Sequence, residues 1–338
     1  MVNPLKIFII TITLGIVLLS GCTAPTEEIE ETTDFGELRF GYQPSTHQIA
    51  YMTADAKGWW LEDLESYGVT STKDFLFPTG APEMTAMLAG EIDVAYVGAT
   101  PPLSAIDQGL DAKIVAGAQV QGSDLVLATD LPYMSPQDLK GLKIATFPPG
   151  TLQDTVLRKW LMDNDIDPKE DLTILGMGGA DAKTALASGN VDAIFLPHPH
   201  PTIAESEGYG RVVVQSGKMW KDHACCVVLV SGKLIREQPE MVEQIVRTHI
   251  RATEYIIEHP QEAAQIFADD IGVSYEIANK SIHDWDGQWV TDPSIELNTT
   301  LEYAKVQYDL GYTDKLLTQS DLFDLSFYNK IMAEMGEE

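Results

Sequence analysis

The chain has 338 residues, a length typical of two domains or of one unit with two lobes, and its 44% of hydrophobic residues is enough for sizeable cores. Its 51 acidic and 22 basic side chains give a formal net charge of -29. That charge argues against nucleic acid and against an anionic membrane surface as binding partners, because phosphate groups need a basic surface. The acidic residues are spread along the chain, so we interpret them as favouring solubility and not as an indication of ligand charge.

The N-terminal segment predicts export and attachment to a membrane. Lys6 precedes an apolar run, Ile7 to Leu19, which is too short to favour a membrane span and fits the hydrophobic part of a signal peptide. The run ends in Leu19-Ser20-Gly21-Cys22, which resembles a lipobox in which Cys22 is lipidated and becomes the mature N-terminus. A plain N-terminal anchor helix is the alternative. We assign residues 1–22 to the signal peptide and residues 23–34, which are acidic and rich in threonine, to a disordered tether.

The two remaining cysteines, Cys225 and Cys226, are neighbours in the sequence. Neighbouring cysteines rarely form a disulfide, because the ring that it closes is strained. We therefore expect both thiols to be reduced and buried, as small apolar residues within the run from Ala224 to Val230.

From Gly36 onward, short apolar runs alternate with helical patterns, and most runs end in a turn rich in Gly, Pro, Ser or Thr. This order predicts an α/β fold with a mostly parallel sheet in each of two units and helices on the sheet faces. The first unit has predicted strands at 38–42, 74–77, 92–97 and 114–118. The second unit has predicted strands at 142–147, 172–175, 194–196 and 212–214, and residues 126–129 and 227–230 carry the chain between the units.

After Ser231 the pattern becomes largely helical, with predicted helices near 239–259, 261–269, 275–285 and 295–311. No chemistry can be assigned to this tail from its sequence. We expect it to pack on the first unit and to supply part of a hinge.

The stretch from Gly141 to Asp154 is typical of a strand, a tight turn and the start of a helix. Thr151 is the predicted N-cap, and Asp154 follows three residues later, as in a capping box. The first N–H groups of a helix are unpaired and lie at the positive end of its dipole, so this turn is a candidate site for an anion or a polar ligand. A plain connection between a strand and a helix is the alternative.

Six motifs occur in a characteristic order after Gly36: Gly41-Tyr42-Gln43-Pro44, Pro78-Thr79-Gly80-Ala81-Pro82-Glu83-Met84, Gly98-Ala99-Thr100-Pro101-Pro102, Lys140-Gly141-Leu142-Lys143-Ile144-Ala145, Gly150-Thr151-Leu152-Gln153, and Ala180-Asp181-Ala182 with Gly189-Asn190-Val191-Asp192-Ala193. Together they resemble the periplasmic substrate-binding proteins of ABC importers for aliphatic sulfonates, taurine, nitrate and thiamine-pyrimidine precursors. The resemblance implies a two-lobed α/β periplasmic-binding-protein fold that closes on a small solute and delivers it to a membrane permease and its ATPase. It also implies a monomer that acts outside the cytoplasm, where the predicted lipid on Cys22 would hold it at the membrane.

The resemblance places the ligand-facing turns at the ends of five strands. The ligand-binding residues that it implies are Tyr42, Gln43, Thr79, Gly80, Ala99, Thr100, Gly150, Thr151, Leu152, Gln153 and His198, with Pro197 beside the last. Turns at the carboxyl ends of strands in one sheet lie along one edge, so these residues are expected to face one cleft. Their hydroxyls, amides and free N–H groups suit a sulfonate, a nitrate or a carboxylate without a full salt bridge.

The sequence departs from this family in two places. Leu152-Gln153-Asp154 follows Gly150 where sulfonate binders usually have Ser or His, and we expect the Asp154 carboxylate to face its own helix N-terminus. Pro197-His198-Pro199-His200, together with His223, Cys225 and Cys226, offers several metal-binding groups. A rival interpretation is a His/Cys metal-dependent enzyme like the pyrimidine synthase branch of the family, and a third is a sensor without an importer.

We expect a binding protein without enzymatic activity, resident cofactor or metal. Ser45, Ser123 and Ser231 lack a Gly-x-Ser-x-Gly context, and the chain has no His-Glu-x-x-His and no P-loop. The predicted division is lobe one at 35–127, lobe two at 128–228 and a return to lobe one at 229–338, with hinges near Ala128 and Val230.

Overall fold

The structure is a computed structural model, and it describes residues 35–336. The described residues form one compact unit, and both hydrophobic cores lie within it. The predicted signal peptide, the lipidated Cys22 and the acidic tether lie outside the described residues. Between residues 35 and 336, no helix is both long enough and apolar enough to cross a membrane.

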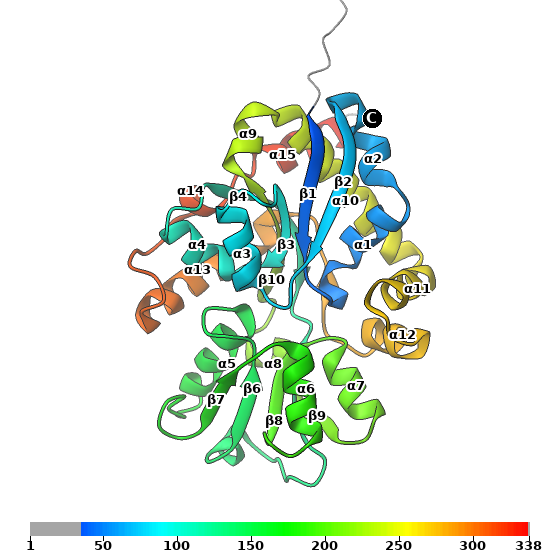
Figure 1. The fold of residues 1–338 in the computed structure, drawn as a ribbon. Coiled ribbons are helices and arrows are strands. Elements are labelled where there is room, and N and C mark those ends of the chain that lie inside the picture. Colours follow the sequence, from blue (N-terminus) through cyan, green and yellow to red (C-terminus); the bar gives the residue numbers. More distant parts are fainter. Residues whose placement is uncertain (1–34, 337–338) are drawn as a thin grey trace, which may run out of the picture. The chain divides into compact units, whose positions relative to one another are not determined.

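The first sheet has six strands in the order β11-β4-β10-β3-β1-β2 (Figure 1). Its strands are β1 (Gly36–Tyr42), β2 (Val69–Leu76), β3 (Val94–Gly98), β4 (Ala112–Val120), β10 (Ala224–Ser231) and β11 (Gln288–Trp289). Strands β1, β2 and β3 pair in parallel, and β10 lies antiparallel between β3 and β4. As a result β1 to β4 all run in one direction.

The second sheet has five strands in the order β7-β6-β8-β5-β9. Its strands are β5 (Ser123–Ala128), β6 (Lys143–Thr146), β7 (Thr173–Gly176), β8 (Ala193–Pro197) and β9 (Gly210–Gln215). Strands β6, β7 and β8 pair in parallel, and β5 lies antiparallel between β8 and β9. The predicted fold class is therefore confirmed, with one antiparallel strand in the middle of each sheet.

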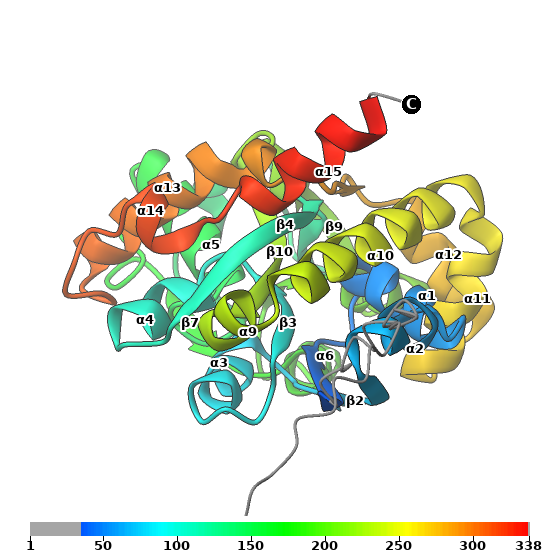
Figure 2. The ribbon, with the colours of Figure 1, turned by 90° about the horizontal axis from the view of Figure 1, so that it is seen from above.

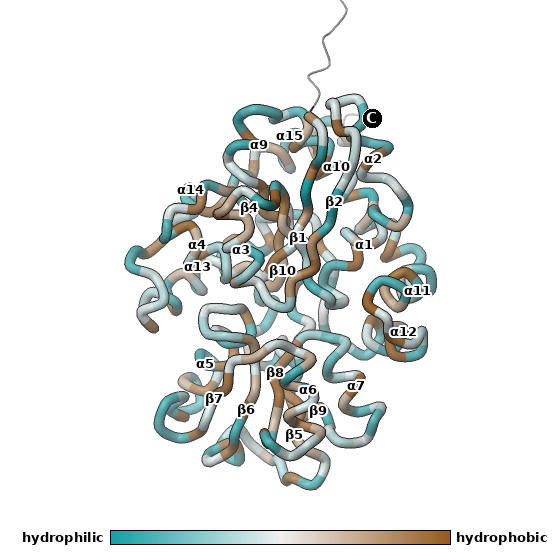
Figure 3. The backbone as a smooth tube through the Cα atoms, viewed as in Figure 1, coloured by the Kyte–Doolittle hydropathy of each residue, from teal (hydrophilic) through white to brown (hydrophobic). Residues whose placement is uncertain are grey.

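Helices cover the faces of both sheets. Those around the first sheet are α1 (Ile49–Ala56), α2 (Trp59–Leu64), α3 (Gly80–Leu88) and α4 (Pro101–Asp107), with the 3-10 helices η1 (Thr46–Gln48) and η2 (Glu65–Tyr67). Those around the second are α5 (Leu152–Asp163), α6 (Gly179–Ala187), α7 (His200–Ser206) and α8 (Ser216–Met219), with η3 (Pro136–Leu139). Figure 3 shows that apolar residues are concentrated in the strands, where these helices bury them.

The C-terminal region is helical, as its sequence predicts. Its helices are α9 (Gly232–Glu237), α10 (Pro239–Glu258), α11 (Pro260–Ile271), α12 (Tyr275–His283), α13 (Pro293–Leu310), α14 (Gln319–Leu322) and α15 (Ser326–Gly336). Most of them pack on the first sheet and its helices, with α10 against α1 and α2 and with α15 beside α10 (Figure 2). In addition α12 contacts α7, and α13 contacts α5, so the tail also reaches the second sheet.

The chain passes between the two sheets at two places. It leaves β4 for β5 through Gln121 and Gly122, both with positive φ (60° and 82°), and it enters β10 next to Asp222, with φ 53°. The segment 284–287, between α12 and β11, lies against the first passage, where Asp286 Oδ1 accepts from Gly122 N. A division at residues 128 and 228 would cut β5 and β10 away from their sheets. We therefore propose that lobe two spans residues 123–221 and that lobe one comprises the rest of the described chain.

Candidate functional site

Turns at the carboxyl ends of strands in both sheets, and the helices that follow these turns, line three cavities, which we call the small, large and side cavities. The small cavity has a volume of about 20 Å³ and is lined by Gln43, Ser45, His47, Gln48, Gly80, Gly98, Pro101, Phe147, Thr151, Leu152, Gln153, Pro197, Cys225 and Cys226. The large cavity has about 180 Å³ and is lined by Gln43, Pro44, Ser45, Pro78, Phe147, Gly178, Gly179, Ala180, Asp181, Pro197 and His200. The side cavity has about 170 Å³ and is lined by Ala81, Met84, Thr85, Leu88, Pro101, Ser104, Ala105, Gln108, Pro149, Gly150 and Thr151.

The small and large cavities adjoin each other, because four residues line both: Gln43 and Ser45 from lobe one, and Phe147 and Pro197 from lobe two. A volume of 20 Å³ holds little more than one water molecule or one ion. The large and side cavities each have room for a small organic molecule, and the large cavity shares four lining residues with the small cavity where the side cavity shares two. The walls of the large cavity are mostly apolar, with a few polar groups at defined places, as in many small-molecule sites.

Six of the predicted site residues line at least one of these cavities. Gln43, Gly80, Thr151, Leu152 and Gln153 line the small cavity, and Gly150 lines the side cavity. Tyr42, Thr79, Ala99, Thr100 and His198 line none of the three.

Tyr42 lies at the end of β1 with its side chain turned into the core of lobe one. Its ring centroid is 4.7 Å from that of Tyr51, and its hydroxyl lies 3.3 Å from Asp270 Oδ2 on α11. Burial raises the pKa of Tyr42. The side chain is 5% exposed, so it has no face left for a ligand in this form of the protein.

The turn before α5 has the predicted helix start but a different hydrogen-bond pattern. Thr151 is the N-cap residue, yet its hydroxyl donates to the carbonyl oxygen of Pro148 at 2.7 Å and caps no helical N–H group. Asp154 accepts from Gly150 N at 3.3 Å and from Arg158 Nε at 2.7 Å. The carboxylate therefore faces its own helix start, as expected, but the capping box between Thr151 and Asp154 is not formed.

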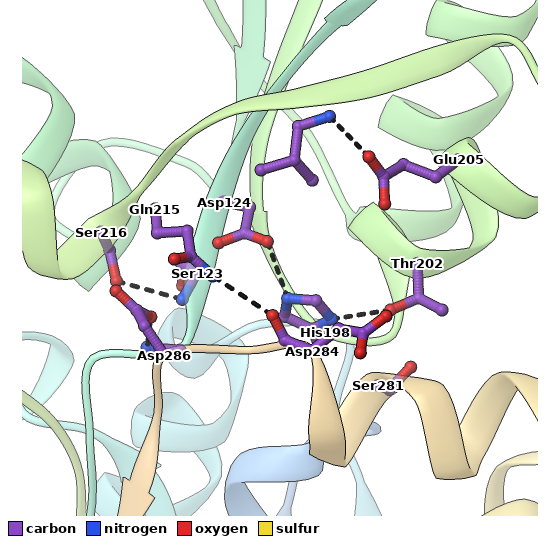
Figure 4. Close-up of polar contacts among 12 residues, drawn as sticks. Ser123, Asp124, His198, Thr202, Glu205, Gln215, Ser216, Ser281, Asp284 and Asp286 are labelled. Carbon is purple, nitrogen blue, oxygen red and sulfur yellow. Dashed lines mark hydrogen bonds and ion pairs between the residues drawn. The ribbon is translucent and has the colours of Figure 1, made fainter.

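His198 is held by both ring nitrogens inside lobe two (Figure 4). Its Nε2 is 2.9 Å from Asp124 Oδ2, and its Nδ1 is 2.8 Å from Thr202 Oγ1. Burial raises the pKa of Asp124, and the contact with His198 opposes this rise. The backbone oxygen of His198 accepts from Thr46 N of lobe one at 3.1 Å. The main chain of His198 thus connects the two lobes. Its side chain is held by Asp124 and Thr202 and lines none of the three cavities.

The cysteines have a partner that the sequence did not suggest. His47 Nδ1 lies 3.3 Å from Cys225 Sγ and 3.6 Å from Cys226 Sγ, and the two sulfur atoms are 4.0 Å apart. The cysteines are free and buried, as expected, but they line the small cavity and are not confined to the core. Contact with Cys225 lowers the pKa of the Cys226 thiol, whereas burial raises the pKa of Cys225. His47 comes shortly after the predicted site residue Gln43, and this closeness in sequence is the signal that could have identified His47 as a site residue.

The cavity walls carry almost no charge. The residues that line the three cavities, all within 35–336, include no lysine and no arginine. Gln43 Nε2 donates to Glu83 Oε2 at 2.7 Å, and burial raises the pKa of that carboxyl well above its usual value. His200 Nδ1 is buried without a hydrogen-bond partner, and burial lowers the pKa of His200 to about 4, so the ring is neutral at pH 7. Asp181, at an exposed position, is the one carboxylate in the large cavity wall.

A two-lobed α/β fold of this kind, with cavities between turns of the two lobes, is the fold of the periplasmic binding proteins. The chain belongs to the NMT1-like family, which matches residues 31–271. It is 23% identical over 330 residues to a Bacillus subtilis (strain 168) protein named for binding aliphatic sulfonates, covering 96% of this chain and 97% of the relative.

Two examples represent the solved structures that share its fold. One is the alkanesulfonate-binding protein SsuA from Xanthomonas axonopodis pv. citri bound to MOPS, with a TM-score of 0.75 and 20% identity over 85% of this chain and 98% of the other. The other is the periplasmic nitrate-binding protein NrtA from Synechocystis PCC 6803, with a TM-score of 0.77 and 15% identity over 88% of this chain and 89% of the other. The predicted family resemblance is thereby confirmed.

Proposed function

We propose that this protein is the solute-binding component of an ABC importer and that it captures a small sulfonate-type or related anionic or polar organic solute. Taurine, alkanesulfonates and mercaptoethanesulfonate are the leading candidates. The observation that carries the proposal is the large cavity, whose walls come from turns of both lobes. The binding proteins among its relatives support it at the level of the family.

Apart from the carboxylate of Asp181, the groups in the cavity wall that such a solute could contact are neutral. Gln43 and Ser45 offer an amide and a hydroxyl from lobe one, and the His200 ring offers its unpartnered Nδ1 from lobe two. Hydrogen bonds from neutral donors bind a singly charged head group without a salt bridge. Phe147 and Pro197 supply apolar surface for the carbon part of the solute.

We propose that the lobes open and close about the two passages, at 121–122 and at 222. A solute that touches both lobes stabilises the closed form, and only this difference in affinity shifts the population. The permease and its ATPase then recognise the closed form. The proposal includes a monomer outside the cytoplasm, held by a lipid on Cys22, with no catalytic activity.

Nitrate is the second candidate, and the fold shared with NrtA favours it. A nitrate ion needs no apolar wall and far less room than the large cavity offers, so the candidates differ in which cavity they use. A thiamine-pyrimidine precursor stays as an alternative within the family.

Calorimetry of the chain from Thr33 to Glu338 with taurine, alkanesulfonates, mercaptoethanesulfonate, nitrate and pyrimidine precursors tests the proposal. Ala180→Leu fills the large cavity and is expected to lower the affinity for an organic sulfonate at least tenfold. Ala187→Leu, at an exposed position on the same helix, is the matched control and is expected to bind normally. Absence of heat with every solute, or equal affinity in both variants, would contradict the assignment.

A further inference from the structure

Strand β10 departs from regular geometry at its two cysteines. In a regular strand neighbouring side chains point to opposite faces of the sheet. The pairing of β10 with β4 shifts register between Ala224 and Cys226 and again between Cys226 and Val227. Such a bulge changes the direction in which a side chain points. Here both sulfur atoms lie close to Nδ1 of the His47 ring.

The three atoms are spaced as the ligands of one tetrahedral metal ion are spaced. Zinc bonds of about 2.3 Å to sulfur and about 2.0–2.1 Å to nitrogen place two sulfur ligands about 3.8 Å apart and a sulfur and a nitrogen about 3.5 Å apart. The corresponding separations here are 4.0 Å for the two sulfur atoms, and 3.3 and 3.6 Å for each sulfur and His47 Nδ1. Each differs from the expected spacing by a few tenths of an ångström.

The histidine ring is oriented for ligation. His47 Nε2 lies 2.8 Å from the carbonyl oxygen of Gly122, which can only accept a hydrogen bond, so Nε2 carries the proton. The lone pair of Nδ1 then faces the two thiols. A backbone carbonyl that fixes the ring of a ligating histidine in this way is a usual outer partner of metal sites.

We propose that His47, Cys225 and Cys226 bind one thiophilic cation, Zn²⁺ or Cu⁺, through Nδ1 and two thiolates. Imidazole and thiolate ligands together favour these ions over Mg²⁺ or Ca²⁺. Binding releases the protons of the two thiols to solvent. Three protein ligands leave one coordination position, and the small cavity, with its 20 Å³, is the space beside it. The proposal revises the expectation of no metal, and it stands whether or not the large cavity binds a sulfonate.

Cobalt(II) is the probe, because tetrahedral thiolate coordination gives it strong visible bands and a sulfur-to-metal charge-transfer band in the near ultraviolet. The chain from Thr33 to Glu338, which contains only these two cysteines, is reduced and titrated anaerobically. We expect one equivalent of Co²⁺ to bind with both bands and one equivalent of Zn²⁺ to displace it. Cys226→Ser, Cys225→Ser and His47→Gln are each expected to bind at least 100-fold more weakly, with altered bands.

His283→Gln removes an exposed histidine far from the cysteines in sequence and is the matched control, expected to titrate as the unchanged protein does. Because a variant can fail to fold, the unchanged protein gives a second measurement: Zn²⁺ should slow alkylation of both thiols at least tenfold. Co²⁺ binding without a charge-transfer band, equal affinity in the cysteine variants, or thiols that react at the same rate with and without Zn²⁺ would each show that the cysteines are merely buried apolar residues.

Discussion

The phenol of Tyr312 donates to Asp154 Oδ2 at 3.1 Å and so connects the C-terminal tail to the first turn of α5 in lobe two. A second contact lies close by, where Gln307 Nε2 donates to the carbonyl oxygen of Gly150 at 2.8 Å. Both bonds cross from one lobe to the other, and we predict that the open form lacks them.

The first prediction follows from Tyr312. The change Tyr312→Phe removes one hydroxyl and no ring atoms, so it weakens the closed form by the worth of one hydrogen bond, about 1 kcal/mol. We expect about a fivefold loss of solute affinity in calorimetry. Tyr308→Phe alters an exposed tyrosine on α13 and should bind as before. Equal affinity in both variants would mean that the bond between Tyr312 and Asp154 is present in both forms.

The second prediction concerns the buried pair of His198 and Asp124. The change His198→Ala leaves the carboxylate of Asp124 buried without its partner, and losing one member of such a pair typically costs about 3–5 kcal/mol. Urea unfolding should show this loss in the free energy of unfolding. Thr202→Val removes a neutral contact to the same ring and should cost about 1 kcal/mol. If His198→Ala were as stable as Thr202→Val, the pair would not be ionic.

The third prediction concerns the charge of the solute. Asp181 carries the one carboxylate in the wall of the large cavity, so Asp181→Asn should strengthen binding of an anion a few-fold, more at low salt than at high salt. Calorimetry at two ionic strengths measures the effect, with Glu207→Gln at an exposed position outside the cavities as the control. Weaker binding in Asp181→Asn would instead indicate a solute with an amino group near this residue.

The fourth prediction concerns pH and His249. Its ring lies 3.0 Å from Tyr96 Oη and 2.7 Å from the carbonyl oxygen of Gly117, and burial lowers its pKa from 6.5 to about 4. As the pH falls below 6.5, the unfolded chain takes up a proton at this ring and the folded chain does not until about pH 4. The free energy of unfolding therefore falls with falling pH across this window, by at most about 1.4 kcal/mol per pH unit from this one group.

In His249→Gln this contribution is absent, so the difference in unfolding free energy between the two proteins should shrink as the pH is lowered from 6.5 to 4. Other titrating groups are common to both proteins and cancel in the comparison. Denaturant unfolding at a series of pH values gives the two slopes. Parallel slopes would show that the pKa of His249 is the same in the folded and the unfolded protein.

Much of this fold could be predicted from short-range pattern alone. The alternation of apolar runs and helical segments predicted most strands of both sheets, because buried strands and amphipathic helices have different hydrophobic periods. It missed β11, and it interpreted residues 126–129, which overlap β5, as a connection between the units. The lobe boundaries were harder. Strand β10 and the part of β5 after Asp124 are largely apolar, so their composition does not say to which sheet each strand belongs. The passages at Gln121 and Asp222 depend on backbone dihedral angles that non-glycine residues rarely adopt.

The candidate site could be predicted in part. Turns at strand ends were found because their position follows from topology, and Gln43, Thr151 and Gln153 do line a cavity. Side-chain direction was less predictable. Tyr42 turns into the core because of its place in the pleat of β1, and His198 finds partners 74 and 4 residues away in the chain. The cluster of His47 with the two cysteines depends on a bulge, which no local pattern marks.

The carboxylate of Asp286 lies where the chain passes between the lobes, and it accepts from Gly122 N at 3.0 Å and from Gly217 N at 2.7 Å. The side chain of Gln121 adds a bond from its Nε2 to the backbone oxygen of Asp286 at 2.7 Å. Because these bonds join Asp286 both to the first passage and to Gly217 of lobe two, we expect them to restrict how far one lobe can twist against the other. The proposed closure would then follow one direction, and the two halves of the site would meet in the same register each time.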